Sequence, residues 1–337
     1  MENKINLRCL ILPLLGVISI SSCKKDASIG NQDDKTLTNA VSIENGYLKF
    51  RDQKAFDSIL NVLVKPENHN LKPKEFQNFK SYRDVYLEIA KEYEKVNNVE
   101  AFNEFKNKYG EIVDIKSDSS LTYKFRTPLS ALFTNLNGEV KIGDITTVYT
   151  KDQRMISYSG KHKSESEINR ISRTDLTNGI FVSNISTKTS TSGNNQASTE
   201  AETTTTAIKS ELYYNEDGKR RLFVDLWLES TPVSGSNSAN FRYYFSSRQE
   251  LKKTFGGWRT NETDYYFSNL NYNYGYTQPP IANPPTINFS LVSYSVGNAT
   301  GPIIIDLGVV KGFAQWISGS GRFFSGGVPN APSFNVN

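Results

Sequence analysis

The chain has 337 residues and a formal net charge of +4 at pH 7, from 39 basic and 35 acidic side chains. This nearly balanced charge gives no electrostatic footprint for nucleic acid. Only two cysteines are present, and the two histidines lie in the polar stretches "PENHN" and "GKHKS", which excludes the usual zinc patterns and argues against cysteine or histidine catalysis. No cofactor, metal or nucleic-acid partner is therefore expected.

Residues 1–22 have the order of a bacterial lipoprotein signal. A short basic start precedes an apolar run that ends at Ile20, shorter than the roughly 20 residues that cross a bilayer. The letters "ISSC" then match a lipobox. We expect cleavage before Cys23 and attachment of lipid there, palmitate included, because two or more acyl chains hold a protein at a membrane. The alternative is an ordinary signal peptide with a chance cysteine.

The next segment, residues 23–46, is polar and predicts a flexible tether. Lipid and tether together predict a protein of the cell envelope, anchored in the outer membrane. Whether it faces the periplasm or the cell surface is left open. Cleavage also removes the other cysteine, so the mature chain is expected to fold without a disulfide.

Residues 47–115 predict a small, mostly helical part. "YLKF" is a short strand candidate, and Asp52 then resembles an N-cap before apolar residues at helical spacing. Ser81, with an aspartate three residues on, predicts a capping box. Asn98 predicts the cap of a third helix, which ends at Gly110.

Residues 116–337 predict a larger β-rich part. Asn137-Gly138 is a strong hairpin signal, and a second turn is expected at 215–218. Residues 183–206 are rich in Ser and Thr and predict a loop or an extended edge strand. The expected fold class is α+β: a small helical N-terminal part, then a mostly antiparallel β sandwich or partly closed barrel.

Two carboxylates offer one route to chemistry. Asp225 and Glu229 alternate with a uniformly apolar set of residues on one strand, and Trp227 lies between them. A sugar stacked on this ring between two acids would suit a glycoside hydrolase. The alternative, which we favour, is the solvated face of a hairpin.

A tyrosine-rich stretch offers a binding surface instead. "DYYFSNLNYNYGY" alternates rings and amides, so Tyr272, Tyr274 and Tyr276 are candidate ligand-binding residues, and Trp258 could join them. Exposed rings stack on sugars, and tyrosine gives rigid contact area at low entropic cost. The alternative is tyrosines packed within a sheet, where they are common.

Several segments resemble uncharacterised Bacteroidetes-type lipoproteins. These are "NGYLKFRDQKAFDSIL", "LNGEVKIGDITTVYT", "FRYYFSSRQELKKTFGGWRT" and the "CKKD" that begins the mature chain. The resemblance implies an anchored envelope protein and supplies no catalytic residues.

We therefore expect a lipid-anchored, non-enzymatic envelope or surface protein that binds a glycan or a protein partner through its β part. The alternatives are a carbohydrate-active hydrolase and a purely structural envelope component.

Overall fold

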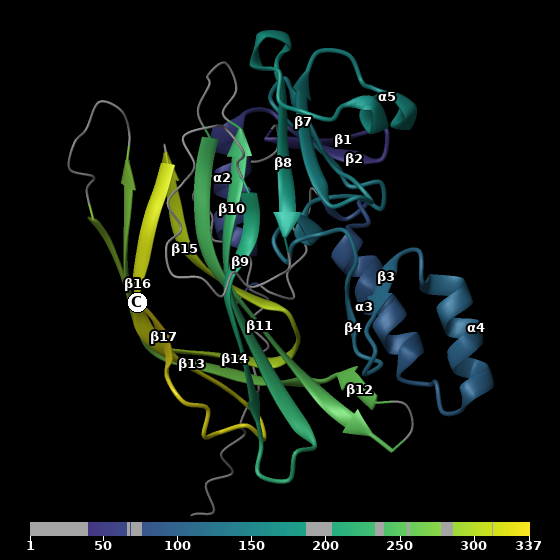
Figure 1. The fold of residues 1–337 in the computed structure, drawn as a ribbon, viewed down its shortest axis with the longest axis vertical. Helices are drawn as coiled ribbons and strands as arrows, with labels where there is room; N and C mark the ends of the chain where they lie inside the picture. Colours follow the sequence, from purple (N-terminus) through teal and green to yellow (C-terminus); the bar gives the residue numbers. More distant parts are fainter. Residues whose placement is uncertain are drawn as a thin grey trace, which may run out of the picture.

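The computed structural model describes residues 40–65, 68, 76–186, 204–232, 239–254, 257–277, 286–311 and 313–337. The fold is α+β, with most of the helices in the N-terminal region and most strands in antiparallel sheets (Figure 1). The predicted signal, Cys23, most of the tether and most of the Ser/Thr tract lie outside the described residues. Within them, no helix combines the length and the apolar character needed to cross a membrane.

The three predicted helices begin at the predicted caps. Asp52 accepts a hydrogen bond from the Ala55 amide at 2.8 Å, Ser81 forms the capping box, and Asn98 accepts from the Ala101 amide at 2.8 Å. These side chains satisfy amides that have no partner within the helix. The helical elements are α2 (Gln53–Leu63), α3 (Tyr82–Tyr93), α4 (Val99–Tyr109), η3 (Ser130–Leu132), α5 (Glu165–Arg170) and η4 (Leu176–Asn178).

A large sheet of 11 strands runs through the molecule. It is antiparallel except where β2 pairs with β5 and β8 pairs with β9. Its strands, in spatial order, are β1 (Val41–Glu44), β2 (Tyr47–Phe50), β5 (Glu139–Ile142), β6 (Ile145–Tyr149), β7 (Arg154–Ser159), β8 (Ile180–Ser186), β9 (Thr204–Tyr214), β10 (Arg220–Pro232), β11 (Ala239–Lys253) and β12 (Gly257–Thr260), with β15 (Ile303–Lys311) also beside β11.

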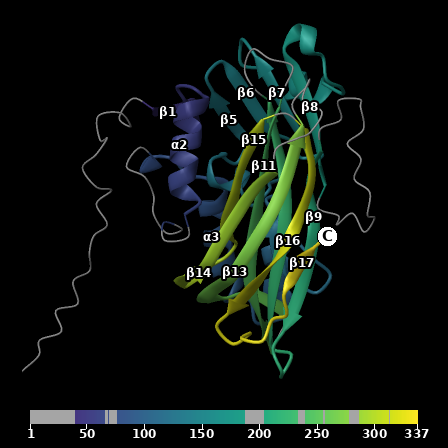
Figure 2. The same cartoon turned by 90° about the vertical axis from the view of Figure 1, so that its left-hand side faces the viewer.

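A small sheet of four strands packs face to face against this large sheet (Figure 2). Its order is β14 (Thr286–Thr300), β13 (Glu262–Thr277), β16 (Phe313–Ser325) and β17 (Phe334–Val336). The main hydrophobic core lies between the two sheets and includes Leu222, Leu226, Phe245, Tyr272 and Phe323. The sheets thus form the sandwich that the alternating apolar pattern predicts.

The other face of the large sheet is also covered. A second core joins Phe56 and Leu60 of α2 to Trp227 of β10 and Tyr244 of β11. A third, smaller core joins α3 and α4 to a hairpin of β3 (Val113–Ile115) and β4 (Leu121–Tyr123). The central strands are therefore buried on both faces.

Three predictions about local structure differ from the structure. The predicted tether, residues 23–46, runs too far, because Val41–Glu44 form β1. The boundary at residue 115 falls inside a structural unit, because β3 pairs with β4 across it. The turn at Asn137-Gly138 is not a hairpin, because the preceding segment is the 3-10 helix η3 rather than a strand. The hairpin turn is Gly143-Asp144, between β5 and β6.

Candidate functional site

The predicted tyrosine patch is wrong because the rings point into the sandwich. Tyr272 and Tyr274 are 0% and 1% exposed. Their hydroxyls donate to the backbone oxygens of Phe334 at 3.0 Å and Leu307 at 2.8 Å. These rings therefore fill the core between the sheets and cannot reach a ligand. The side chain of Tyr276 lies outside the described residues.

Trp258 is also buried, although it was predicted as a partner of that patch. Its ring lies under the Arg221 guanidinium, 4.1 Å from the ring centroid, and contacts the edge of the Tyr214 ring. Arg221 is itself held by Asp118 and by the buried Glu250. Trp258 thus packs β12 against side chains of β9 and β10 and offers no face to a ligand.

The asparagines between the buried tyrosines face outward. Cross-strand pairing places them in rows with serines of β14 and β16, on the solvent side of the small sheet. We call this surface the outer face. It consists of Tyr266, Ser268, Asn271, Asn273, Asn288, Ser290, Ser293, Ser295, Ser318, Ser320, Arg322 and Phe324. Its one charged member is Arg322, so amides and hydroxyls dominate.

Two aromatic rings stand at one end of the outer face. Tyr266 is 46% exposed and is the direct cross-strand neighbour of the half-buried Phe324. The Arg322 guanidinium lies 6.0 Å from the Phe324 ring centroid, and the Tyr266 hydroxyl lies 3.5 Å from a carboxylate oxygen of Asp264. Direct cross-strand neighbours such as Tyr266 and Phe324 have Cβ atoms about 5 Å apart. The two rings therefore form a small aromatic platform beside the rows of polar side chains.

A local break in the geometry of β13 shifts the alternation of inward and outward side chains by one residue. Asn269 has a left-handed backbone, with φ 52°, and its β14 neighbour Val292 is 77% exposed. Inward positions are Tyr265 and Phe267 before this point and Leu270 after it. The sequence shows a period of two on both sides of this point but does not show the shift between them. It therefore does not predict that Tyr266 lies on the same outward face as Asn271 and Asn273.

The two predicted carboxylates do not form a hydrolytic pair. Four residues along an extended strand separate them by about 13 Å, more than the roughly 5–9.5 Å between the acids of most glycosidases. Glu229 is 1% exposed, and Asp225 faces the Arg248 guanidinium at 3.5 Å. The favoured alternative, a solvated hairpin face, is also wrong at Trp227 and Glu229, because the second core covers them.

Glu229 is instead the centre of a buried hydrogen-bond network. Its carboxylate accepts from the Tyr149 hydroxyl and the Thr127 hydroxyl, each at 2.9 Å, and from the Tyr244 hydroxyl at 3.1 Å. Burial raises the pKa of Glu229, and the three hydrogen bonds and the nearby Arg242 oppose that rise. The network ties the N-terminal elements to the central strands.

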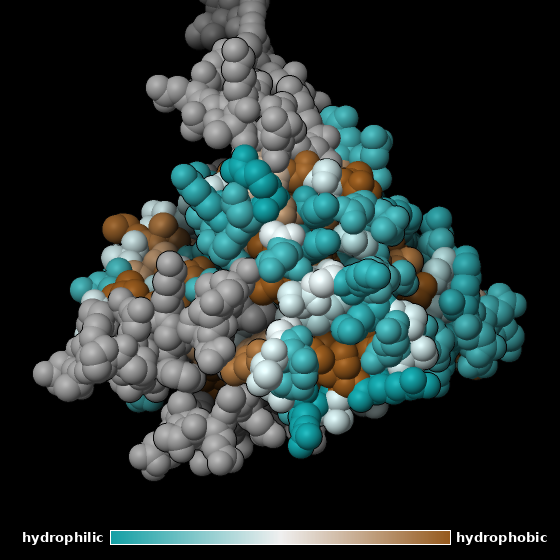
Figure 3. Space-filling model, turned by 90° about the horizontal axis from the view of Figure 1, so that it is seen from above, coloured by the Kyte–Doolittle hydropathy of each residue, from teal (hydrophilic) through white to brown (hydrophobic). Residues whose placement is uncertain are grey.

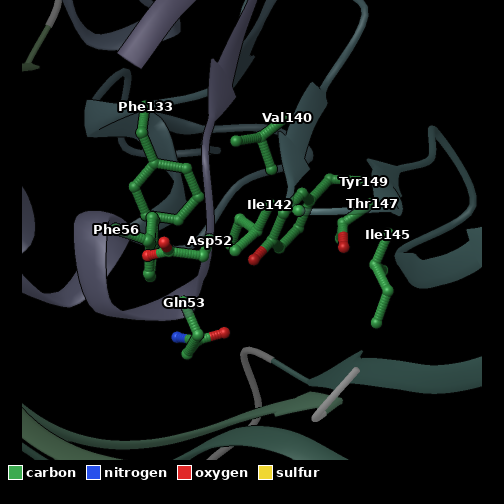
Figure 4. A pocket seen from close by; sticks show the side chains of 10 residues that line it. Asp52, Gln53, Phe56, Phe133, Val140, Ile142, Ile145, Thr147 and Tyr149 are labelled. Atoms are coloured by element: carbon green, nitrogen blue, oxygen red, sulfur yellow. The ribbon is translucent and has the colours of Figure 1, made fainter. Parts of the chain in front are cut away.

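Tyr149 also lines a small pocket (Figure 4). It has a volume of about 140 Å³ and is lined mainly by apolar side chains, among them Phe56, Phe133 and Ile142, with Asp52 and Gln53 at the α2 end. Ligand sites usually measure about 300–1,000 Å³, so this pocket is too small for a sugar chain.

The face viewed in Figure 3 shows hydrophobic residues only as separate patches.

Within the described ranges, no group of three or more His, Cys, Asp or Glu residues could hold a metal ion. His162 lies near the surface and contacts the Glu139 carboxylate at 2.9 Å. The outer face, with an exposed aromatic ring beside rows of amides and hydroxyls, is the candidate site.

Comparison with known proteins adds little beyond the geometry. No family model matches the chain, and no curated protein matches it. Among solved structures, it is similar to a DUF4848 family protein from Bacteroides thetaiotaomicron, with 16% identity over 86% of this chain and 96% of that chain, and a TM-score of 0.26. A similarity at this level carries no argument about fold or function.

Proposed function

We propose that this chain is a lipid-anchored envelope protein whose outer face binds a neutral glycan. The observation that carries the proposal is the exposed Tyr266 ring, beside Phe324, at the end of rows of Asn and Ser that contain no carboxylate. A sheet surface that carries rings and amides suits a hydroxyl-rich ligand laid along it.

The side chains of the outer face match the chemistry of sugars. An amide offers both donors and acceptors, and a serine hydroxyl offers one donor and two acceptor positions, so both satisfy sugar hydroxyls. Aromatic rings supply apolar contact area for the flat face of a sugar ring. Asn271 is already oriented, because it accepts from the Ser290 hydroxyl at 2.8 Å and donates to the Asn269 backbone oxygen at 3.2 Å.

The direct test is glycan binding by the protein and by one ring variant. We expect Tyr266→Ala to weaken binding about ten-fold, which corresponds to about 1.4 kcal/mol, on a glycan array and then by titration calorimetry. Tyr214→Ala is the matched control, because Tyr214 is 53% exposed on the large sheet, away from the outer face.

Equal losses in both variants, or no loss in Tyr266→Ala, would overturn the assignment of the outer face. Failure of the unmodified protein to bind any glycan would leave the structural envelope role as the better account. Either result is interpretable only if both variants unfold at the same denaturant concentration as the parent protein.

The membrane anchor rests on the lipobox and the polar segment that follows it. We expect Cys23→Ser to move the protein from the membrane fraction to the soluble fraction, because the lipid is the anchor. Retention in the membrane fraction would contradict this part of the proposal. Protease treatment of intact cells then distinguishes a surface-facing protein, which is digested, from a periplasmic one, which is protected.

A further inference from the structure

We propose that Asp264 is a specificity-determining residue of the outer face, where its carboxylate selects a neutral sugar with two adjacent free hydroxyls. This role rests on the proposed function, because Asp264 would act on the glycan that stacks on the Tyr266 ring.

Asp264 lies on the same side of β13 as the Tyr266 ring. Side chains two residues apart on a strand share a face, and an oxygen of the Asp264 carboxylate lies 3.5 Å from the Tyr266 hydroxyl. Asp264 therefore extends the outer face by one position beyond the aromatic platform. A sugar that stacks on the Tyr266 ring would have its edge beside this carboxylate.

A β-bulge fixes the position of the carboxylate. The pairing of β13 with β14 shifts between Thr263 and Tyr265, and Asp264 lies beside Asn298, whose φ is 49°. The Asn298 amide donates to Oδ1 of Asp264 at 2.9 Å, and the Asp264 backbone oxygen accepts from the Gly326 amide at 2.8 Å. Bulges often re-aim a side chain. Asp264 is thus held by β14 on one side and by the turn after β16 on the other.

The carboxylate keeps the capacity to accept further hydrogen bonds. Its two oxygens have about four acceptor positions in total. Oδ1 accepts from one backbone amide, and Oδ2 faces one phenolic hydroxyl at the long distance of 3.5 Å. Among the described residues, these contacts leave an acceptor position on each oxygen of Asp264. Two hydroxyls on adjacent sugar carbons can therefore each donate to one oxygen.

The surface beside the carboxylate has a position without a side chain. Gly297 of β14 is exposed, and a Cβ added there would lie 3.4 Å from Oδ1 of Asp264. A larger residue at this position would cover the carboxylate, whereas the glycine leaves space for the edge of a sugar. A hydrogen bond to an ionised acceptor is roughly twice as strong as a neutral one. An acidic sugar would bring a second negative charge to Asp264, so the site favours neutral glycans.

Binding of native and O-methylated polysaccharides tests the role of Asp264. The probes are soluble glucan, mannan and galactan, because methylation of their hydroxyls removes the donors but keeps the rings that stack. We expect Asp264→Asn to weaken binding of the native polymers that the parent protein binds by about ten-fold, which corresponds to about 1.4 kcal/mol. The variant should also discriminate less than the parent between native and O-methylated polymer. Glu262→Gln is the matched control, because Glu262 is an exposed acid of the same strand, farther from the Tyr266 ring.

Two further variants leave Asp264 in place. Gly297→Leu would cover the carboxylate and should also weaken binding about ten-fold; the Gly297 φ lies outside the left-handed region, so the backbone accepts a leucine. This variant provides the test if Asp264→Asn folds poorly. Tyr266→Phe keeps both the ring and the carboxylate and should bind like the parent protein.

The outcomes separate this role from the proposed function. Unchanged binding by folded Asp264→Asn and Gly297→Leu, or an equal loss in Glu262→Gln, would overturn the role of Asp264, and the proposed function would stand if Tyr266→Ala still binds less. A loss in Tyr266→Phe as large as in Tyr266→Ala would overturn it too, because the phenol would then be the polar group that recognises the sugar. If the parent protein binds no glycan, both the proposed function and the role of Asp264 fail.

Discussion

Replacing Glu229 by Gln tests the buried network in the centre of the molecule. The amide keeps the shape of the carboxyl group and one acceptor oxygen, which can serve Thr127 and Tyr244 at their present distances of 2.9 and 3.1 Å. The amide nitrogen then faces the Tyr149 hydroxyl, which loses its acceptor at 2.9 Å. A buried donor left without a partner costs about 1–3 kcal/mol, so we expect the free energy of unfolding to fall by that amount.

The size of this loss should depend on pH. Burial raises the pKa of Glu229 above its ordinary value of 4.5, so the folded protein holds this proton more tightly than the unfolded chain does. The stabilisation from that proton is complete below pH 4.5 and is lost as the pH rises through the folded-state pKa. The amide of the Glu229→Gln variant does not titrate, so the stability difference between the two proteins should be largest near pH 4 and smaller at pH 7.

Urea unfolding followed by tryptophan fluorescence measures this difference. Trp227 is a suitable reporter, because its ring stacks on Tyr244 at 6.2 Å between centroids, next to the network. Glu216→Gln, in the exposed turn between β9 and β10, is the matched control and should leave the midpoint unchanged. Equal stability of the Glu229→Gln protein at every pH, or a loss that grows with pH, would refute the reasoning.

Three further substitutions probe other contacts. Arg221→Ala removes the 2.5 Å partner of the buried Glu250, which keeps Arg248 at 3.4 Å, so urea unfolding should show a loss of about 1–3 kcal/mol. An unchanged unfolding midpoint would contradict this. Gly319 has a φ of 143°, and a Cβ added there would lie 2.2 Å from a backbone oxygen of β13. We therefore expect Gly319→Ala to fold poorly and to melt at a lower temperature. A normal melting temperature would refute the clash. Tyr272→Phe removes one buried hydrogen bond, so the free energy of unfolding should fall by about 1 kcal/mol, and glycan binding should not change. Weaker glycan binding by a folded variant would show that Tyr272 belongs to the binding site.

Local features of the sequence predicted the local structure well. The caps at Asp52, Ser81 and Asn98 each act on amides three residues away, so nothing distant is needed to read them. The turn at 215–218 joins β9 and β10 as expected, and Leu222 and Leu226 line the core on one face of β10. The α+β class follows from the change in hydrophobic period after residue 115, which is a property of short windows.

The candidate site could not be read in the same way. A strand with alternating side chains has two possible buried faces, and only the sheet packed against it decides between them. In β13 the large sheet covers Tyr272 and Tyr274, so the asparagines face solvent. The left-handed residue Asn269 then shifts the alternation, which brings Tyr266 to the same outward side.

Where helices begin and where the chain turns could be predicted from the sequence, because caps and turns depend on neighbours within a few positions. The tertiary structure alone decided that Trp258 and Glu229 are buried, that rows of Asn and Ser form one surface, and that β14 lies at an edge. Each of these depends on segments far apart in the chain, and burial on one side of a strand is settled only when its partners are in place.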